Sequence, residues 1–303
     1  MDRIDAMRVF SRVVERRSFT LAAEDLGLPR STVTDAVKQL EARLGVQLLQ
    51  RTTRHVSPTL DGEAYYQRCL SILADIEDAE GAFAGAKPKG LLRVDVHGTL
   101  GRHFLLPSLP AFLETYPDIE IYISEGDRYV DLVREGIDCV LRAGSLLDSD
   151  MVARRVGTLE EMTLASPGYI AAHGLPRHPD DLPGRHRMVA FHSTATGGHL
   201  PLEFIVDGKV RNIMLPSTVL VNGAETYHAA AKLGLGLIQI PRYRGDIAVQ
   251  AGELVEVLPD YPPTSTPVSL LYPRNRQLSP RVRVFIDWVA KEFAVRNAEV
   301  QRA

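Results

Sequence analysis

The stretch that decides the fold covers residues 18–44 and reads SFTLAAEDLGLPRSTVTDAVKQLEARL. Two helical patterns in it are separated by the break GLP at residues 27–29. In the second pattern apolar residues recur at i, i+4, i+7 and i+11, as on one face of a helix: Val33, Val37, Leu40 and Leu44. Small polar and charged residues occupy the opposite face. A short helix, a tight turn and a second helix of this kind predict a helix-turn-helix, in which residues 30–44 enter a DNA major groove.

The flanking residues complete this unit. Residues 4–16 have an apolar stripe at helical spacing and predict a supporting first helix. Ser18 and Thr20 are candidate N-caps of the second helix. Gly27 can end that helix in the left-handed conformation, and Pro29 suits the first turn of the next one.

A short strand and a basic loop follow the predicted recognition helix. After leucines at 48 and 49, residues 51–55 read RTTRH and have no apolar face. Beside a helix-turn-helix, such a loop predicts a wing that contacts the phosphate backbone or enters the minor groove. The alternative is a solvated turn.

The distribution of charge agrees with DNA binding, although the net charge of the 303 residues is −3. Residues 1–60 contain ten Lys and Arg against seven Asp and Glu, so a basic excess lies with the helix-turn-helix. Cys69 and Cys139 have no metal-ligand spacing, so neither a disulfide framework nor a zinc site is expected, and no cofactor is predicted. The chain has no apolar signal core and no run of about 18 apolar residues, which predicts a soluble cytoplasmic protein without a membrane partner.

A long helix is predicted over residues 59–83. Its apolar residues follow heptad spacing and form a seam of the coiled-coil kind: Tyr65, Cys69, Ile72, Ile76, Ala79 and Phe83. Such a seam can pack on its own domain, but a helix between two domains finds its main apolar surface in a partner copy. We therefore expect homodimerisation here, with Cys69 as an apolar filler and not a redox switch.

Beyond the linker sequence GAKPKG at residues 85–90, strand and helix patterns alternate. The order strand, helix, strand, helix, strand predicts a parallel sheet with helices on its faces, in the segments 92–97, 102–114, 119–123, 129–134 and 138–142. A further strand-like run covers 159–166. A second alternating set follows between residues 188 and 240 and includes a hairpin at Asp207-Gly208.

Two α/β lobes joined near Met162 and Thr266 would leave a cleft between them. The expected division of the chain is residues 1–58 for DNA binding, 59–89 for the linker helix and hinge, and 90–303 for the two lobes. Lobe I would contain about residues 90–161 and 267–303, and lobe II about residues 162–266.

Over essentially its whole length, the chain resembles the LysR-type transcriptional regulators. The N-terminal motifs are SFT from residue 18, STVT from 31 and LEARLGVQLLQRTTR from 40. C-terminal motifs include GLLRV from 90, YPDIE from 116, SPGYI from 166 and LGLGLIQIP from 233. The resemblance implies an α/β protein with an N-terminal all-α winged helix-turn-helix, a long dimerising linker helix and a two-lobed effector domain like a periplasmic-binding protein. It also implies dimers or dimers of dimers on promoter DNA, contact with RNA polymerase, and a small-molecule effector in the cleft.

By position, the resemblance places DNA contacts on the recognition helix and the wing: Arg30, Ser31, Thr34, Asp35 and Arg54. Arg30 can form a bidentate contact with guanine, and Ser31 and Thr34 are short enough to reach bases or phosphates. Lys38, Arg51 and Thr53 complete the predicted set, with Lys38 and Arg51 as phosphate contacts that add affinity but little sequence preference.

Asp35 departs from the family pattern, which usually has Arg, Lys, Gln or His at this position. A carboxylate that faces phosphates is repelled by them. Asp35 therefore either accepts a hydrogen bond from a cytosine amine or pairs with Arg30 or Lys38. We favour the ion pair.

The resemblance places the effector site between the lobes. Thr99 and Leu100 lie between a predicted strand and its helix, where N–H groups and a hydroxyl suit a carboxylate or another polar group. Other candidates come from the corresponding strand ends: Asp127, Arg142, Phe191, His192, Ser193 and Asn222. Each could instead be a loop or capping residue. The Gly98-Thr99 step and the polar run 192–194 suggest a small anionic or polar effector.

Three other classes of protein fit the sequence less well. An enzyme is not expected, because the chain has no G-x-S-x-G elbow, P-loop or H-E-x-x-H motif. A secreted solute-binding protein would match residues 90–303 but would leave residues 1–85 unexplained. A general nucleoid protein would not need a two-lobed cleft. The sequence therefore favours an effector-controlled regulator of transcription that binds specific DNA.

Overall fold

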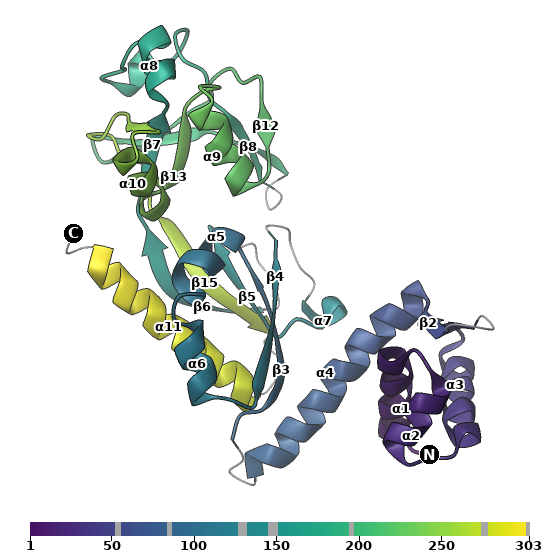
Figure 1. Cartoon of the computed structure of the whole chain (residues 1–303). Coiled ribbons are helices and arrows are strands. Elements are labelled where there is room, and N and C mark those ends of the chain that lie inside the picture. The colour runs from purple at the N-terminus through teal and green to yellow at the C-terminus, as the bar shows by residue number, and fades with distance from the viewer. Residues whose placement is uncertain are drawn as a thin grey trace.

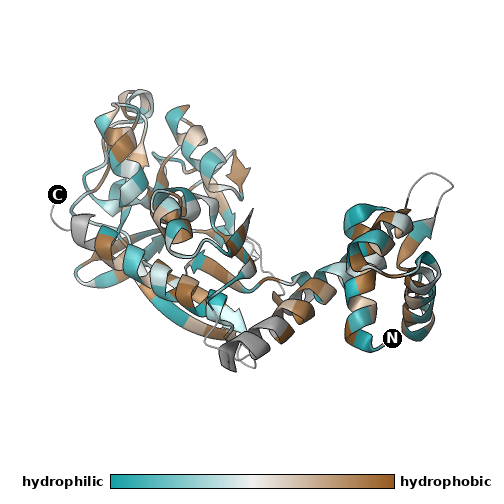
Figure 2. Cartoon of the chain, turned by 60° about the horizontal axis from the view of Figure 1, so that its bottom comes forward, coloured by the Kyte–Doolittle hydropathy of each residue, from teal (hydrophilic) through white to brown (hydrophobic). Residues whose placement is uncertain are grey.

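The computed structural model describes residues 1–51, 56–83, 87–126, 132–144, 151–193, 197–273 and 278–300. Figure 1 shows three parts in chain order: a small helical unit at the N-terminus, one long helix, and a larger α/β part that contains the C-terminus. In Figure 2, hydrophobic and hydrophilic residues alternate around most of the helices, as expected where one face of each helix is buried.

The N-terminal unit consists of α1 (Arg3–Arg16), α2 (Phe19–Leu26) and α3 (Arg30–Leu44). These helices are followed by β1 (Leu49–Arg51) and β2 (Val56–Pro58), which pair in the antiparallel direction. The predicted helix-turn-helix and the short strand after it are therefore confirmed.

Local chemistry explains where these helices begin and end. The Ser18 Oγ accepts a hydrogen bond from the N–H of Leu21 at 3.3 Å, so Ser18, and not Thr20, is the N-cap of α2. Gly27 ends α2 with a φ of 63°, a left-handed conformation that glycine adopts without a steric penalty. Pro29 occupies the N-cap position of α3, just before the first turn predicted for it.

One buried cluster joins the three helices. Phe10 and Val13 of α1, Ala22 of α2 and Val37 of α3 are completely buried in it. The methyl group of Ala22 allows the helices to approach closely, because a larger side chain would separate them. Since α3 is held by its inner face, its outer face remains exposed to solvent.

The long helix α4 (Leu60–Phe83) begins in direct contact with this unit. The Thr59 Oγ1 accepts a hydrogen bond from the N–H of Gly62 at 2.9 Å and donates one to the carbonyl of Gln47 at 2.7 Å. A Cβ on Gly62 would lie 1.9 Å from the carbonyl oxygen of Leu48. Only glycine permits this approach, so the start of α4 is fixed against the N-terminal unit.

The first half of the predicted dimer seam packs on the chain's own helices. Cys69 is completely buried in the cluster of the N-terminal unit, and Tyr65 packs against that cluster with its ring 5.6 Å from the ring of Phe10. The prediction that Cys69 faces a partner copy is therefore wrong, because no part of it reaches the surface. Burial raises the pKa of its thiol to about 12, as suits an apolar filler.

The second half of the seam is more accessible. The exposed fraction of Ile72 is 36%, and Ile76 is half-buried. The side chains of Ala79 and Phe83 lie outside the described residues. The predicted dimer surface on α4 is thus reduced to its C-terminal part.

Lobe I is built on a five-stranded sheet with strands β3 (Gly90–Val96), β4 (Ile119–Glu125), β5 (Cys139–Ala143), β6 (Met151–Leu159) and β15 (Thr266–Pro273). Their order is β4-β3-β5-β15-β6. β3 pairs parallel with β4 and β5, as predicted, whereas β15 pairs antiparallel with β5 and β6. The returning strand β15 therefore makes the sheet mixed.

The helices of lobe I are α5 (Gly98–Leu100), the π-helical turn η1 (Gly101–Leu105), α6 (Leu109–Thr115), α7 (Leu132–Glu135) and α11 (Pro280–Val300). The single helix predicted over 102–114 is thus broken into η1 and α6. Pro110 lies in the first turn of α6, where its missing N–H has no helical partner to lose.

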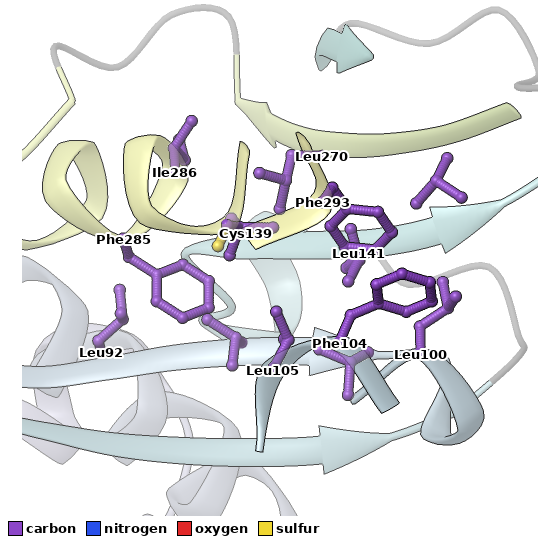
Figure 3. Packing of buried hydrophobic residues seen from close by; sticks show 14 of the residues in the cluster. Leu92, Leu100, Phe104, Leu105, Cys139, Leu141, Leu270, Phe285, Ile286 and Phe293 are labelled. Atoms are coloured by element: carbon purple, nitrogen blue, oxygen red, sulfur yellow. The ribbon is translucent and has the colours of Figure 1, made fainter. Parts of the chain in front are cut away.

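Aliphatic and aromatic side chains fill the space between α11 and the sheet, as Figure 3 shows. The ring of Phe104 stacks on that of Phe293 with centroids 4.2 Å apart, and both side chains are buried. Leu92 of β3 and Phe285 of α11 belong to the same cluster. This core holds η1 and α11 on one rigid lobe.

Among its described residues, lobe II contains two three-stranded sheets and one hairpin. The first sheet has the order β13-β7-β14, formed by β7 (Glu161–Ala165), β13 (Ile238–Pro241) and β14 (Val255–Glu256). The second has the order β12-β8-β9, formed by β8 (Ala190–Ser193), β9 (Gly198–Leu200) and β12 (Leu220–Val221). The predicted hairpin at residues 207–208 joins β10 (Leu202–Val206) to β11 (Lys209–Ile213).

The described part of lobe II also has four helical segments: α8 (Pro167–His173), η2 (Pro179–Asp181), α9 (Ala224–Lys232) and α10 (Arg242–Gln250). The strand-like run predicted at 159–166 is divided between the end of β6 and β7, with a break at residue 160. The chain passes from lobe I to lobe II at this break and returns at Thr266, which pairs with Leu159. The two connections therefore lie side by side.

Candidate DNA-binding and effector-binding sites

The outer face of α3 presents the polar side chains that the sequence assigned to DNA. Arg30, Ser31, Asp35 and Lys38 are all exposed. The inner face is held in the core by buried apolar side chains: Val33, Ala36, Val37 and Leu40. This division gives α3 one face for packing and one face free for a groove of DNA.

Thr34 is half-buried, and its hydroxyl donates a hydrogen bond to the carbonyl of Arg30 at 2.9 Å. The bond returns to the preceding turn of the same helix, so the hydroxyl proton is already used. The oxygen of Thr34 can still accept a hydrogen bond, for example from a base amine.

The ion pair that we favoured for Asp35 is not formed. Both proposed partners, Arg30 and Lys38, are among the described residues, and neither carries a salt bridge to Asp35 within them. The carboxylate therefore remains on the exposed face of α3. Of the two interpretations of Asp35, the contact with a cytosine amine is the one that this geometry leaves open.

The wing lies mostly outside the described residues. Arg51 is the last residue of β1 and is opposite Val56 of β2. Thr53 and Arg54 belong to residues 52–55, which the structure does not describe. Their predicted DNA contacts stay predictions.

Glu41 is a positioning residue that the sequence interpretation missed. Its Oε1 accepts hydrogen bonds from the N–H groups of Leu48 at 2.9 Å and Leu49 at 3.1 Å. These bonds attach the start of β1 to the last turn of α3. The signal for this role was weak, because a glutamate eight residues before a strand has many other uses.

On lobe I, Arg142 forms a buried ion pair with Asp95 of β3. Its Nη1 also donates to the carbonyl of Leu141 at 3.2 Å. The second Asp95 carboxylate oxygen accepts a hydrogen bond from the Ser124 hydroxyl at 2.5 Å. The guanidinium of Arg142 thus contacts groups of the sheet itself. Its predicted role as an effector contact is not supported by this geometry.

Thr99 and Leu100 have different surroundings. Leu100 is buried in the core of lobe I, so its side chain cannot contact an effector and that prediction is wrong for the side chain. The Thr99 hydroxyl lies 2.8 Å from His97 Nδ1 and accepts a hydrogen bond from the Tyr243 hydroxyl at 3.0 Å. Because Tyr243 belongs to α10 of lobe II, Thr99 lies where the two lobes meet.

Tyr243 is half-buried against lobe I. Its ring centroid is 4.4 Å from that of His103 and 5.2 Å from that of Phe104. Burial raises the pKa of the Tyr243 phenol. Burial also lowers the pKa of His103, with a further contribution from the nearby Arg296. The contact is therefore made mainly by neutral rings.

A set of ion pairs accompanies this contact. Arg102 of η1 bonds to Glu125 at 2.9 Å and to Glu225 of α9 at 3.0 Å. Glu225 also pairs with Arg244 of α10 at 3.0 Å. Arg102 and Glu225 belong to different lobes, so these charges join the two lobes. The sequence interpretation missed them because the residues lie 123 positions apart.

The candidates from lobe II come from two neighbouring strands. β12 pairs parallel with β8 and places Val221 beside Phe191, so Asn222 follows the end of β12 next to His192 of β8. Phe191 packs edge-to-face on Tyr227 with a centroid distance of 5.2 Å, and Asn222 is exposed.

The remaining lobe II candidates are His192 and Ser193, which are neighbours in β8. The Nδ1 atom of His192 is buried and has no hydrogen-bond partner among the described residues. Ser193 is half-buried, and Asp127, the last lobe I candidate, lies outside the described residues. The unpartnered nitrogen makes His192 the candidate with spare hydrogen-bonding capacity.

Two family models match the chain. The LysR substrate binding domain matches residues 85–294, and the bacterial regulatory helix-turn-helix proteins of the lysR family match residues 4–63. The chain belongs to the LysR family of transcriptional regulators. It thus has a helix-turn-helix DNA-binding domain and an effector-binding domain.

Relatives of similar length are also transcriptional regulators. An uncharacterized HTH-type transcriptional regulator, YhjC of Escherichia coli K12, is 40% identical over 294 residues, which cover 96% of this chain and 97% of that protein. An HTH-type transcriptional repressor of Pseudomonas aeruginosa UCBPP-PA14 is 37% identical over 310 residues, covering 99% and 95% of the two chains.

Solved structures show the same architecture. CrgA, a LysR-type transcriptional regulator from Neisseria meningitidis, is similar with a TM-score of 0.59 and 30% identity over 95% of this chain and 98% of that one. The full-length Vibrio cholerae virulence activator AphB has a TM-score of 0.58 and 26% identity, and covers 96% and 99%. The predicted fold class is confirmed.

Two further observations concern only the part of the chain that the structure describes. No group of three or more His, Cys, Asp and Glu side chains could hold a metal ion there. In the same residues, no helix combines the length and the apolar character that a membrane span requires.

Proposed function

We propose that this protein binds a specific operator through the outer face of α3, and that a small polar molecule held between the lobes changes its effect on transcription. The observation that carries the first part is the exposure of Arg30, Ser31, Asp35 and Lys38 opposite a fully packed inner face. Membership of the LysR family supports a role as a DNA-binding transcriptional regulator. The specificity, the ligand and its position are our proposal.

Arg30 is the residue on which sequence preference should depend most. It lies at the start of α3, where a recognition helix usually contacts base edges. A bidentate contact between arginine and guanine gives about 1–3 kcal/mol of discrimination. Lys38 lies two turns later and can only supply a single charge, so it should contact phosphate.

The effector part of the proposal is supported by the contacts between the lobes. A ligand changes a conformational equilibrium only if it binds one state better than the other. The Tyr243–Thr99 hydrogen bond and the Arg102–Glu225 ion pair join the lobes in the state seen here. A molecule that enters between the lobes would compete with these contacts or strengthen them. The polar groups of Thr99, His192 and Asn222 favour a polar or anionic ligand.

Oligomerisation completes the proposal. A single helix-turn-helix with a small basic excess makes few phosphate contacts and binds DNA weakly. Two copies joined through the accessible C-terminal part of α4, including Ile72 and Ile76, would present two α3 helices to two half-sites. We further propose that the bound dimer, or dimer of dimers, contacts RNA polymerase at the promoter.

A matched pair of variants tests the DNA-binding part. Fluorescence anisotropy would be measured with the DNA that flanks the protein's own gene and with versions substituted at each base pair. Arg30→Ala should lose the preference at one base pair in each half-site, by about tenfold to a hundredfold. Lys38→Ala should weaken binding to all sequences equally and lower the salt slope by about 1. An Arg30→Ala protein that weakens binding uniformly and keeps every preference would refute the proposed role of α3.

A further inference from the structure

A cavity of about 470 Å³ lies at the junction of the N-terminal unit, α4 and lobe I. Its walls come from α1 and the end of α2, from the middle of α4, and from the start of β3 with residues before β5 and in α11. This junction is separate from the region where the two lobes meet. Thr99 follows the carboxyl end of β3, whereas the cavity is at the beginning of that strand, about 20 Å away along seven residues.

The lining of the cavity is unusually rich in guanidinium groups. Its charged residues are four arginines and two carboxylates: Arg8, Arg12, Arg93, Arg281, Glu15 and Asp138. The net charge of these six side chains is therefore positive. A concave site of this volume is in the range of small-ligand pockets, and a basic lining attracts anions into it.

The two carboxylates are already engaged with groups of the cavity wall. Glu15 pairs with Arg12 at 3.1 Å, and Asp138 lies 3.7 Å from Arg281. Asp138 also accepts a hydrogen bond from the backbone N–H of Arg93 at 2.9 Å. These two carboxylates thus balance the charges of Arg12 and Arg281. The charges of the other two arginines of the cavity are not balanced by them.

Arg8 and Arg93 are the remaining cations. Within the described part of the chain, neither guanidinium forms an ion pair. Arg8 is exposed on α1, and Arg93 is half-buried on β3. A half-buried guanidinium that faces a basic cavity without a counter-charge raises the free energy of this arrangement, and an anion would remove that penalty.

We propose that this cavity binds a small polyanion, with at least two carboxylate or phosphate oxygens, that contacts Arg8 and Arg93 together. Guanidinium groups bind carboxylate and phosphate oxygens in pairs, and each arginine can supply two parallel N–H donors. Arg8 belongs to the DNA-binding domain and Arg93 to lobe I. One bound anion would therefore fix the orientation of these two parts. This site is additional to the effector site of the proposed function and does not depend on it.

The test uses the full-length protein without DNA. Inorganic phosphate, and then citrate, would be titrated by calorimetry at an ionic strength held constant with sodium chloride. We expect saturable binding of at least one of these anions by the unmodified protein. Arg8→Gln and Arg93→Gln should each weaken it tenfold or more. Arg3→Gln, which removes the same charge from an exposed position of α1 outside the cavity, should change it less than twofold.

The two cavity variants, Arg8→Gln and Arg93→Gln, are measured separately so that poor folding of one does not prevent the test. Arg93 lies within the sheet, whereas Arg8 is on the surface of a helix, so Arg8→Gln should retain the wild-type circular dichroism spectrum. Absence of saturable binding for both anions would overturn the proposal. So would equal binding by all three variants, which would indicate adventitious anions only. A change of dimer dissociation in Arg8→Gln and Arg93→Gln without anion binding would also overturn it, since the cavity would then be a contact between copies.

Discussion

The attachment of β1 to α3 by Glu41 can be tested with two substitutions of the same residue. Glu41→Ala removes the acceptor of both hydrogen bonds, from the N–H groups of Leu48 and Leu49. Glu41→Gln keeps a side-chain oxygen of the same reach but removes its charge. The comparison therefore separates the presence of an acceptor from its ionisation.

The expected magnitude follows from the burial of the two donors. Leu48 and Leu49 are only 1% and 3% exposed, so water cannot easily replace the lost acceptor. Hydrogen bonds to charged groups contribute about 1.5–3 kcal/mol each, and neighbouring bonds to one atom are not additive. We expect Glu41→Ala to destabilise the N-terminal unit by about 3 kcal/mol. Glu41→Gln should cost about 1 kcal/mol, because a neutral acceptor remains.

The assay exploits the position of the single tryptophan. Trp288 lies in α11, with its ring 4.8 Å from that of Phe112, and reports on lobe I alone. Urea unfolding would be followed by helical circular dichroism and by tryptophan fluorescence in parallel. With an m-value of about 1.5 kcal/mol/M for a unit of this size, the Glu41→Ala transition of the N-terminal unit should move by about 2 M.

Three results would refute this reasoning. The fluorescence transition should stay in place, so an equal shift of both signals would show that Glu41 acts on the whole chain. An unchanged circular dichroism transition would show that the hydrogen bonds contribute nothing. Equal loss in the two variants would show that the neutral amide oxygen cannot serve as an acceptor.

Three more predictions concern charges elsewhere in the chain. Arg142→Met should destabilise lobe I by about 3–5 kcal/mol, because it leaves the buried Asp95 carboxylate without its ion-pair partner. Adding Asp95→Leu should restore part of the lost free energy of unfolding, measured with urea. No restoration would argue against the ion pair. Burial raises the pKa of Glu161 to about 8, well above its value of about 4.5 in an unfolded chain. Between these two pH values the unfolded state releases the proton and the folded state keeps it, so the stability of the fold falls as pH rises. Glu161→Gln should flatten this fall in the melting temperature, and an unaltered pH dependence would contradict the burial effect. Asp35→Ala should change the operator selected from randomised DNA if Asp35 contacts a base, whereas uniformly stronger binding to every sequence would exclude that contact.

Much of the N-terminal unit could be predicted from the sequence because its determinants are local. The apolar spacing in residues 30–44, the N-cap at Ser18 and the glycine at 27 act within one or two helical turns. Their effects are the same in any tertiary context that buries the apolar face. The bounds of α3 therefore agree with the sequence pattern.

The effector domain shows where such inference stops. Arg142 lies at a strand end, as predicted, but its partner Asp95 is 47 residues away, and nothing local indicates that the two pair. Leu100 follows a strand and could have faced a ligand, yet the packing of α11 covers it. The helix α10, which brings Tyr243 to Thr99, was not predicted, because Gly245 interrupts its short helical pattern.

The prediction for the first half of the dimer seam was wrong for a similar reason. Its spacing correctly indicated a buried face, but spacing alone does not say which surface buries it. Cys69 is covered by the chain's own helices, which lie beside α4 because Gly62 allows the close approach to Leu48. The partner of an apolar stripe is a property of the tertiary structure.

That close approach at Gly62 has a mechanical consequence. With its base clamped to the DNA-binding domain, the 24-residue helix α4 acts as a stiff lever about 36 Å long and not as a flexible tether. A tilt of about 5° between the helix and its neighbour in a dimer would displace a recognition helix by about 3 Å at that distance. This is close to the rise of one base pair, about 3.4 Å. Small changes of angle far from the DNA could thus decide whether two half-sites are in register.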